Sequence, residues 1–315
     1  MISLIVPVLN EQVNIEPLYQ RVKEVFCRLN TDFEVLFVDD GSSDGTLAEI
    51  ARIHRLDPRI KAISLSRNFG QQNAVSAGLD YVQGAATIIL DGDLQHPPEL
   101  IETLVARWKE GAEVVYTVRR STRSAGLFKR LTSAMFYRLF QILTQVDLPQ
   151  NSADFKLLDA KVVGALRTMR ERSRFLRGLI SWVGFSSVAV DYHAPPRAGG
   201  VSSYTPARML RLAIDGIVSF STVPLYISIY FGFALACLGF VYSIYVLYAY
   251  LVLKTVVAGW SSTIILVALV GGLQLIVMGC VGLYIGKIFE EVKQRPLYLV
   301  REAIGIDSFS PASAR

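Results

Sequence analysis

Two aspartates, one residue apart, follow an aliphatic run in the first third of the chain. The run Ala86–Leu90 leads into Asp91, Gly92 and Asp93, and Gln95 comes two residues later. On a turn just past a strand, both carboxylates can approach one ion. Mg²⁺ usually binds one or two carboxylates together with the oxygens of a substrate phosphate. The pattern therefore predicts a divalent cation bridging Asp91 and Asp93 to a nucleotide diphosphate, with Gly92 allowing a close approach of the backbone.

A second acidic pair, Asp39 and Asp40, follows another aliphatic run. The next segment, Ser43 to Thr46, has the residue types of a helix start, so we expect it to cap a helix. D-x-D pairs also occur in loops by chance, and the position after a strand is what favours a metal site here. Acids and bases that converge without a ligand would repel or desolvate one another. Polar residues at the other predicted strand ends are Asn10, Glu11, Arg67, Asn68, Arg119 and Arg120.

Short aliphatic runs alternate with helical patterns over residues 1 to 120, which predicts an α/β fold with a mostly parallel sheet covered on both faces. In open sheets of this kind, ligands bind beyond the carboxyl ends of the strands. Residues 121–205 are less regular. Strands are predicted within 3–9, 34–40, 61–66, 86–93 and 113–118, and helices within 15–29, 46–54, 71–81 and 98–109.

The C-terminal third is strongly apolar. The chain has 315 residues, of which 52% are apolar, and its mean hydropathy is positive. No charged residue occurs from Ile217 to Leu253 or from Thr255 to Gly286, and each stretch exceeds the roughly 20 residues that span a bilayer as a helix. We expect two transmembrane helices with Lys254 near the turn between them.

The charges around these stretches predict their orientation. Basic residues flank the apolar pair on the outer side of each stretch, so both termini should be cytoplasmic. The N-terminus lacks the basic segment of a signal peptide and is predicted to be a strand. Residues 206–222 form either an amphipathic helix in the membrane interface or an ordinary helical lead-in. The flanking basic residues are Arg208, Arg211, Lys287, Lys293, Arg295 and Arg301.

Composition argues against several classes of function. The three cysteines have neither disulfide nor metal spacing. The net charge of +5 comes without a nucleic-acid-binding signature, so we expect no nucleic acid and instead an attraction to anionic lipid head groups. Small residues along the second apolar stretch predict close helix packing in a homo-oligomer. They are Gly271, Gly272, Gly279, Gly282 and Gly286.

Four segments together resemble a known family. They are IVPVLNE at 5–11, VDDGSSDGT at 38–46, SRNFGQQNAVSAG at 66–78 and LDGDLQHPPE at 90–99. They closely resemble the family 2 glycosyltransferases of the GT-A fold. The form D-x-D-L-Q-x-P-P, with two C-terminal spans, resembles the polyprenyl-phosphate glycosyltransferases. That branch includes dolichol-phosphate mannose synthases and bacterial undecaprenyl-phosphate glucosyl and aminoarabinosyl transferases. The resemblance covers nearly the whole chain.

The resemblance implies roles for individual residues. Arg119 matches a basic residue at a strand end, Lys129 and Arg130 match a pair beside the acceptor phosphate, and Arg197 matches the arginine of a loop that closes on the donor diphosphate. Ser203 replaces a lysine of that loop, which weakens the expected clamp. The implied nucleotide-sugar site is Pro7, Leu9, Glu11, Val38, Asp40, Asp91, Gly92, Asp93, Gln95 and Arg197, and the implied ligands of Mg²⁺ or Mn²⁺ are Asp91, Asp93 and Gln95.

Asp154, in the segment SADFKLL, resembles the bacterial subgroup. We expect it to act as a general base, as a group that orients sugar hydroxyls, or as a structural residue. The run Arg170, Arg172, Arg174 and Arg177 has helical spacing without an acidic partner and is predicted to be solvated or membrane-facing. His96 is predicted to be a packing or turn residue.

The predicted function is inverting transfer of a hexose, with glucose from UDP-glucose preferred, to undecaprenyl-type phosphate at the cytoplasmic face of a bacterial inner membrane. The alternative donors are GDP-mannose and an aminoarabinosyl nucleotide. A processive polysaccharide synthase is disfavoured because Arg107-Trp108 lacks the expected glutamine, and a lipid transporter because the spans lack a polar path. The predicted domains are 1–205 catalytic, 206–222 amphipathic, 223–286 transmembrane and 287–315 a cytoplasmic juxtamembrane tail.

Overall fold

A computed structural model of the protein describes residues 1–119, 152–172, 174–192, 221–252 and 259–306. The chain divides into two compact units. The second unit comprises Ile142–Gln145 and Tyr204–Gln294, and the first comprises the remainder, including Arg295–Arg315 beyond the second unit.

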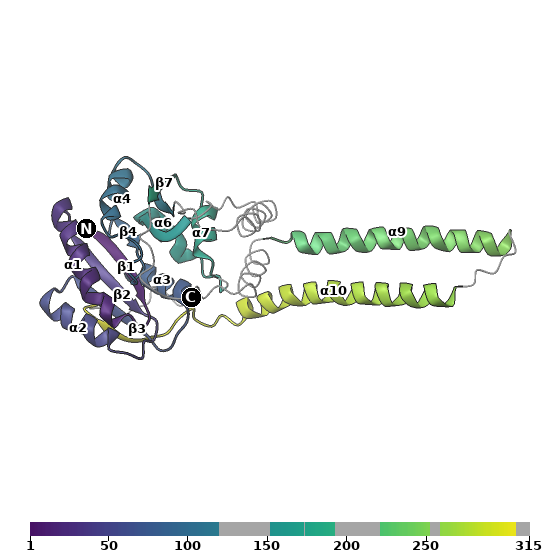
Figure 1. Cartoon of the computed structure of the whole chain (residues 1–315), viewed down its shortest axis with the longest axis horizontal. Helices are drawn as coiled ribbons and strands as arrows, with labels where there is room; N and C mark the ends of the chain where they lie inside the picture. The colour runs from purple at the N-terminus through teal and green to yellow at the C-terminus, as the bar shows by residue number, and fades with distance from the viewer. Residues whose placement is uncertain (120–151, 173, 193–220, 253–258, 307–315) are drawn as a thin grey trace. The chain divides into compact units, whose positions relative to one another are not determined.

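Within the described residues, the first unit is built on one eight-stranded sheet with the order β7-β5-β6-β4-β1-β2-β3-β8 (Figure 1). β1 pairs in parallel with β2 and β4, β2 with β3, and β5 with β7. Only β6 and β8 run antiparallel to their neighbours in this sheet. The predicted mostly parallel sheet is confirmed. The strands are β1 (Ile2–Val8), β2 (Phe33–Asp39), β3 (Ile60–Leu65), β4 (Ala86–Ile89), β5 (Val114–Arg119), β6 (Ser152–Asp159), β7 (Ser187–Tyr192) and β8 (Val300–Ile304).

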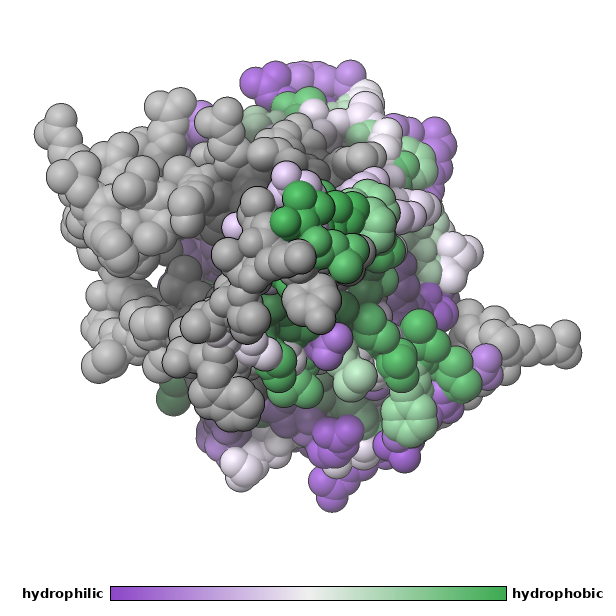
Figure 2. Space-filling view, turned by 90° about the vertical axis from the view of Figure 1, so that its right-hand side faces the viewer, coloured by the Kyte–Doolittle hydropathy of each residue, from purple (hydrophilic) through white to green (hydrophobic). Residues whose placement is uncertain are grey.

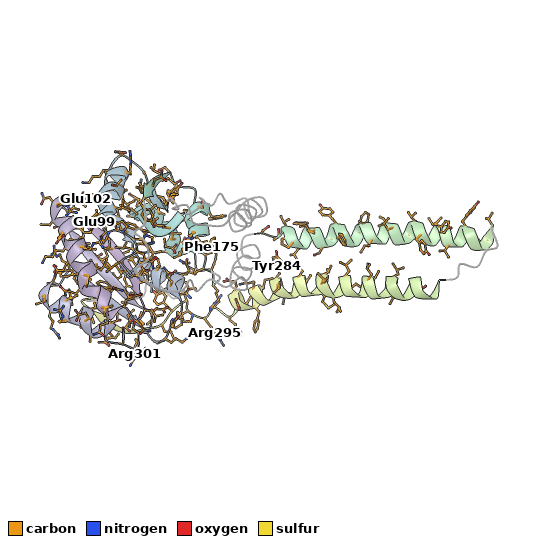
Figure 3. The ribbon with its side chains drawn as sticks, viewed as in Figure 1. Glu99, Glu102, Phe175, Tyr284, Arg295 and Arg301 are labelled. Carbon is orange, nitrogen blue, oxygen red and sulfur yellow. The ribbon has the colours of Figure 1, made fainter. Side chains whose placement is uncertain are left out.

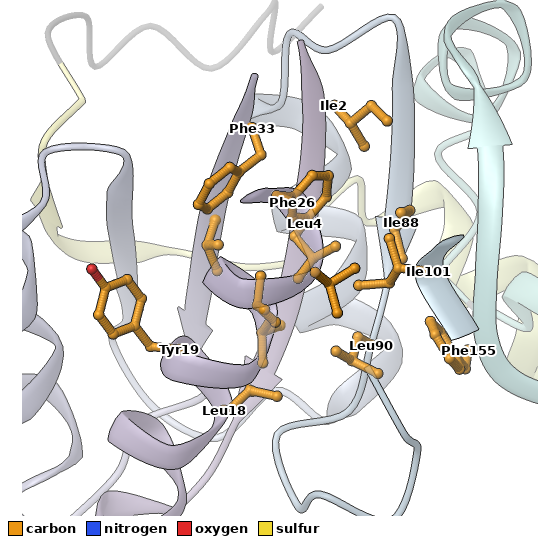
Figure 4. Close-up of a cluster of buried hydrophobic side chains, with 14 of the residues drawn as sticks. Ile2, Leu4, Leu18, Tyr19, Phe26, Phe33, Ile88, Leu90, Ile101 and Phe155 are labelled. Carbon is orange, nitrogen blue, oxygen red and sulfur yellow. The ribbon is translucent and has the colours of Figure 1, made fainter. Parts of the chain in front are cut away.

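Helices cover both faces of the sheet. α1 (Gln12–Leu29), α2 (Thr46–Leu56) and α4 (Leu100–Lys109) lie on one face, and α3 (Gln71–Tyr81), α6 (Ala160–Thr168) and α7 (Leu176–Trp182) on the other. Between the sheet and the first group lies the larger core, part of which is shown in Figure 4. There the rings of Phe26 and Phe33 stack with centroids 4.6 Å apart. Burial of these aliphatic and aromatic side chains is the main force that holds the strands at their positions.

The prediction that residues 287–315 form a separate juxtamembrane tail is wrong for the described part of that range. Val300–Ile304 forms β8, which pairs antiparallel with β3 and supplies that strand with the partner that an edge strand lacks. Ser66 N donates to the Leu299 carbonyl (2.8 Å), and Tyr298 Oη donates to Asp80 Oδ2 on α3 (2.7 Å). Arg295 and Arg301, labelled in Figure 3, belong to this returning segment. The α/β unit therefore extends beyond residues 1–205.

The second unit contains α9 (Val223–Leu251) and α10 (Trp260–Val292). Among the described residues, these two helices are long and apolar enough to cross a membrane. Their apolar side chains are largely exposed, and hydrophobic residues gather in the middle of the face shown in Figure 2. Tyr284, labelled in Figure 3, donates to the Ser221 carbonyl ahead of α9 (2.7 Å). Lys254 and residues 206–220 of the predicted amphipathic helix lie outside the described residues.

Candidate active site

One cleft collects the ends of four parallel strands. Because β1, β2, β3 and β4 run in the same direction, the segments that follow them meet at one edge of the sheet. The cleft there has a volume of about 310 Å³. The predicted convergence of strand-end residues is confirmed for Glu11, Asp40, Asn68, Asp91 and Asp93. The residues that line the cleft are Pro7, Val8, Leu9, Glu11, Asp40, Asn68, Gly70, Gln71, Ala74, Asp91, Gly92 and Asp93.

The acidic pair at the end of β2 organises the floor of this cleft. Asp40 is 4% exposed, and its carboxylate accepts hydrogen bonds from the backbone N–H groups of Phe69 (2.7 Å) and Gly70 (2.9 Å). Burial raises the pKa of Asp40 above its usual value, although the two amides oppose the shift. Asp39 accepts from Ser64 Oγ (2.7 Å) and Ser42 N (2.9 Å). Asp40 therefore fixes the segment after β3, and its role in the implied nucleotide-sugar site remains a prediction.

Val38 has a different place from the one predicted. Val38 is 0% exposed and is the next-to-last residue of β2. A side chain without accessible surface cannot contact a ligand, so Val38 supports Asp40 from the core and does not line the nucleotide site.

The segments after β1 and β2 are tied together by their own polar groups. Asn10 adopts a left-handed backbone (φ 57°), accepts from Ser43 N (2.9 Å) and donates its own N–H to Ser42 Oγ (2.9 Å). Asp44 accepts the Thr46 N–H (3.0 Å) at the start of α2, although the N-cap position itself is Gly45. This part of the motif serves the helix start, as predicted, and the mutual ties hold Glu11 at the rim of the cleft.

The two carboxylates after β4 each have a dedicated partner. Asp91 Oδ1 accepts from Gln71 Nε2 on α3 (2.7 Å). Asp93 accepts both the backbone N–H (3.1 Å) and the side-chain Nε2 (2.7 Å) of Gln95. A Cβ on Gly92 would lie 2.7 Å from Val8 Cγ1, so packing against β1 requires glycine at this position.

The donor set fits a hard divalent cation. Asp91 and Asp93 both line the cleft and supply oxygen ligands. Within the described residues, no group of three or more His, Cys, Asp or Glu side chains is placed to hold a metal. Mg²⁺ and Mn²⁺ commonly complete such a two-carboxylate site with substrate phosphates and water. Gln95 holds Asp93 in this structure, and its predicted role as a direct ligand remains a prediction.

His96 lies beside this site, which the sequence interpretation did not anticipate. Its Nε2 is 3.4 Å from Asp91 Oδ2, and its Nδ1 is 2.8 Å from Tyr192 Oη on β7. The ring packs against Phe155 and Tyr192, each with centroids 5.7 Å away. His96 therefore orients Asp91 as well as filling a turn. Its closeness to the D-x-D pair was the available signal in the sequence.

The arginines after α6 make ion pairs and part-buried hydrogen bonds, so the prediction that this run has no acidic partner is wrong for Arg170 and Arg177. Arg170 pairs with Asp80 (2.7 Å), and Arg177 forms two hydrogen bonds to Asp154 (2.7 and 2.8 Å). Arg174 donates to Ser76 Oγ (3.0 Å) and to the Met169 carbonyl. The chain leaves helical geometry between α6 and α7, so these side chains do not share one helix face.

Asp154 and Lys156 bring further charge to the same region from β6. Burial, the largest influence, would raise the pKa of Asp154, but Arg177, Lys156 and His96 outweigh it and hold the pKa below its usual value. Lys156 is 4% exposed. Burial lowers the pKa of its ammonium group to about 8, and the attraction of Asp154 and Asp91 opposes the shift.

Several predicted residues lie outside the described part of the chain. These are Lys129, Arg130, Arg197 and Ser203, and for Arg119 only the backbone at the end of β5 is described. Their predicted roles stay predictions.

Comparison with known proteins identifies the family. The model described as glycosyl transferase family 2 matches residues 3–167. The chain is 46% identical to the glycosyltransferase YkcC of Bacillus subtilis, covering 97% of this chain and 95% of that protein. It is 40% identical to the glycosyltransferase sll0501 of Synechocystis, with coverages of 97% and 96%.

Similarity also extends to a protein with a named substrate. The chain is 37% identical to the SfII prophage-derived bactoprenol glucosyl transferase of Shigella flexneri, covering 96% of this chain and 98% of that protein. A weaker structural similarity, at a TM-score of 0.47 and 17% identity, exists to glucosyl-3-phosphoglycerate synthase from Mycobacterium tuberculosis and covers 70% of this chain and 79% of that chain. The family model and these full-length relatives place the chain in glycosyltransferase family 2, as an enzyme with the GT-A fold.

Proposed function

We propose that this protein transfers glucose from UDP-glucose to a polyprenyl phosphate, forming a lipid-phosphate-linked sugar with inversion at the anomeric carbon. The observation that carries the proposal is the cleft in which Asp91 and Asp93 meet Asp40 and Glu11. A nucleotide diphosphate needs this combination of a divalent-metal site and a polar pocket beside it. The 37% identity to a bactoprenol glucosyl transferase supports glucose and a polyprenol as the two substrates.

In the proposed reaction, the acidic residues of the cleft would bind the metal, and their neighbours would orient them. Asp91 and Asp93 would hold Mg²⁺ or Mn²⁺, which when bound neutralises the charge that grows on the departing diphosphate. Gln71 and His96 orient Asp91, and Gln95 orients Asp93, through the contacts described above. Partners that fix metal-ligating side chains sharpen the geometry of such sites.

The remaining predicted residues complete the reaction scheme. Arg197 would close on the diphosphate, and Lys129 and Arg130, together with Arg119, would hold the acceptor phosphate against its repulsion from the donor. A phosphate monoester is already largely ionised at neutral pH, because its second pKa is about 6. The acceptor oxygen can therefore attack without transferring a proton to the protein, and direct displacement inverts the anomeric centre.

The two long apolar helices would anchor the enzyme beside its lipid acceptor. Their length and composition are suited to a bilayer, and the basic residues at their outer ends favour a cytoplasmic site at a bacterial inner membrane. Among the described residues, nothing lies within 4 Å of the Cβ positions of Gly282 and Gly286 on α10. This space could accept a helix of a second copy, so we include homo-oligomerisation through the membrane helices in the proposal.

The test is transfer of label into lipid. The purified protein would be incubated with undecaprenyl phosphate, Mg²⁺ or Mn²⁺ and separately labelled UDP-glucose, GDP-mannose and an aminoarabinosyl nucleotide, and the lipid phase would be extracted. We expect label in lipid from UDP-glucose. Label from one of the other donors would retain the reaction class and correct the sugar. Absence of label with every donor would refute the proposal.

A further inference from the structure

The sheet places Asp154 near Asp91 and Asp93, because its strand, β6, is the antiparallel neighbour of β4. β6 pairs antiparallel with β4, with Lys156 opposite Ile89. Asp91 comes two residues after Ile89, and Asp154 comes two residues before Lys156. Residues two apart on one strand share a face, so Asp154 and Lys156 lie on the same side of β6, and Asp91 lies just beyond the end of β4.

Lys156 lies within electrostatic range of both acids. Its buried ammonium is stabilised by Asp154 and by Asp91. Nearby like charges repel, and Lys156, together with the Arg177 guanidinium group at Asp154, offsets the repulsion between these two acids. Asp154 does not line the cleft that holds Asp91 and Asp93, but it interacts electrostatically with His96, whose Nε2 lies 3.4 Å from Asp91 Oδ2. It therefore lies next to the diphosphate site without being part of it. The group that a nucleotide sugar carries next to its diphosphate is the sugar.

Arg177 determines which lone pairs Asp154 can offer. Its Nε donates to Oδ1 (2.7 Å) and its Nη2 to Oδ2 (2.8 Å), so each carboxylate oxygen accepts one hydrogen bond from Arg177. A carboxylate has about four acceptor positions, and lone pairs on both oxygens remain for hydroxyl donors. The side chain of Asp154 is 21% exposed, which leaves surface for such a contact.

The start of α7 is anchored to the same helix that supports the metal site. α7 begins directly after Phe175, which is labelled in Figure 3. Leu176 N donates to Gln72 Oε1 (3.1 Å), and the adjacent residue Gln71 donates to Asp91. The first turn of α3 thus bonds to Asp91 through Gln71 and to Leu176, the residue before Arg177, through Gln72. This connection sets the spacing between the diphosphate site and Asp154.

We propose that Arg177 is a positioning residue that holds Asp154 as a fixed, ionised acceptor for hydroxyl groups of the donor sugar, so that Asp154 does not serve as the general base. The inference rests on the proposed function. A carboxylate in a bidentate pair with a guanidinium group is oriented and stabilised as the anion, which makes it a weak proton acceptor and a strong hydrogen-bond acceptor.

The test compares binding of UDP-glucose with binding of UDP, measured by calorimetry in detergent with Mg²⁺ present. Arg177→Met keeps the apolar part of the side chain and removes the guanidinium group that bonds to both oxygens of Asp154. We expect UDP-glucose to bind about tenfold more weakly or worse, because hydrogen bonds to a charged group are lost or misplaced, while the affinity for UDP stays the same. Arg177→Lys, which restores the charge, should recover part of the loss.

Arg170→Met is the matched control. It removes an arginine just before α7 that pairs with Asp80. Asp80 lies nine residues and about 13 Å along α3 from Gln71. We expect unchanged affinity for both ligands. If Arg177→Met weakens the binding of UDP and of UDP-glucose equally, or weakens the binding of neither, the positioning role is refuted. If wild type binds UDP-glucose but labels no lipid, the proposed function fails while this inference stands.

Asp154→Asn separates the two roles of the carboxylate. Asparagine keeps one acceptor oxygen and cannot take up a proton. We expect transfer to persist with a raised KM for UDP-glucose and an unchanged shape of the pH–rate profile. Loss of all transfer with intact UDP-glucose binding would make Asp154 the general base and overturn the proposal.

Discussion

Replacement of Asp40 by asparagine tests whether the floor of the cleft is held as the structure indicates. The carboxylate accepts two backbone N–H groups, from Phe69 and Gly70. An asparagine side chain can accept with only one oxygen, and its NH₂ group then faces the second N–H. The variant therefore leaves one amide without an acceptor at a position that is 4% exposed.

The expected loss of stability follows from these two contacts. An orphaned buried donor costs about 1–3 kcal/mol. Burial raises the pKa of Asp40, so removal of the charge relieves part of its desolvation and places the net loss at the lower end, about 1–2 kcal/mol. For a unit of this size, 1 kcal/mol corresponds to about 2–4 °C in Tm. We expect Asp40→Asn to lower Tm by roughly 2–8 °C and to weaken UDP binding, because the segment after β3 lines the cleft.

Thermal unfolding in detergent and calorimetric UDP binding measure both effects. Asp44→Asn is the matched control, since it makes the same change in the same connection at an exposed side chain that water can satisfy. Its effect should stay within about 0.5 kcal/mol. An unchanged Tm for Asp40→Asn, or an equal loss for Asp44→Asn, would contradict the reasoning from burial.

Three further predictions concern the metal site, acid stability and the returning strand. Asp93→Ala should abolish lipid labelling while Tm stays near that of wild type, because the residue lines the cleft; retained labelling would exclude its metal role. Hydrogen bonding from Arg59 lowers the pKa of Asp57 from 3.8 to about 2. At 1.36 kcal/mol per pH unit, this shift contributes about 2 kcal/mol or less after allowance for the half-exposed arginine. That stability is present above pH 3.8 and is lost as the pH falls toward 2, so wild type and Asp57→Asn should converge in unfolding free energy there; parallel curves would contradict the assignment. Tyr298→Phe removes the hydrogen bond to the buried Asp80 and should cost about 1–2 kcal/mol with unchanged transfer per folded molecule. Unchanged stability would show that Tyr298 does not fasten the C-terminal segment to α3.

Local patterns predicted most of the first five strands and their helices. The aliphatic runs matched β1 to β5 within a few residues, and the range of α3, Gln71–Tyr81, was predicted at both ends. β4 stopped earlier than expected, at Ile89. Beyond it, Leu90 N still bonds to the Ile5 carbonyl, but Leu94 takes a left-handed backbone (φ 58°) and the chain turns.

Two strands were not predictable from their own residues. β6 carries Asp154 and Lys156 on one face, which looks irregular until both its neighbours, β4 and β5, are in place. β8 follows two long apolar helices and becomes a strand only because β3 offers it a free edge. Neither pairing has a local signal, since each joins segments more than 30 residues apart.

By itself the sequence predicted a divalent-cation site at the D-x-D pair and determined the presence of two long apolar helices, because residue type, spacing and hydropathy are local properties. It could not show that Gln71 and His96 hold Asp91, that Arg177 holds Asp154, or that Val38 is inaccessible. Those facts depend on the register between strands and on where the α3 and α7 helices begin. Only burial of the common core fixes such positions, so the tertiary structure decided which charges meet at the cleft.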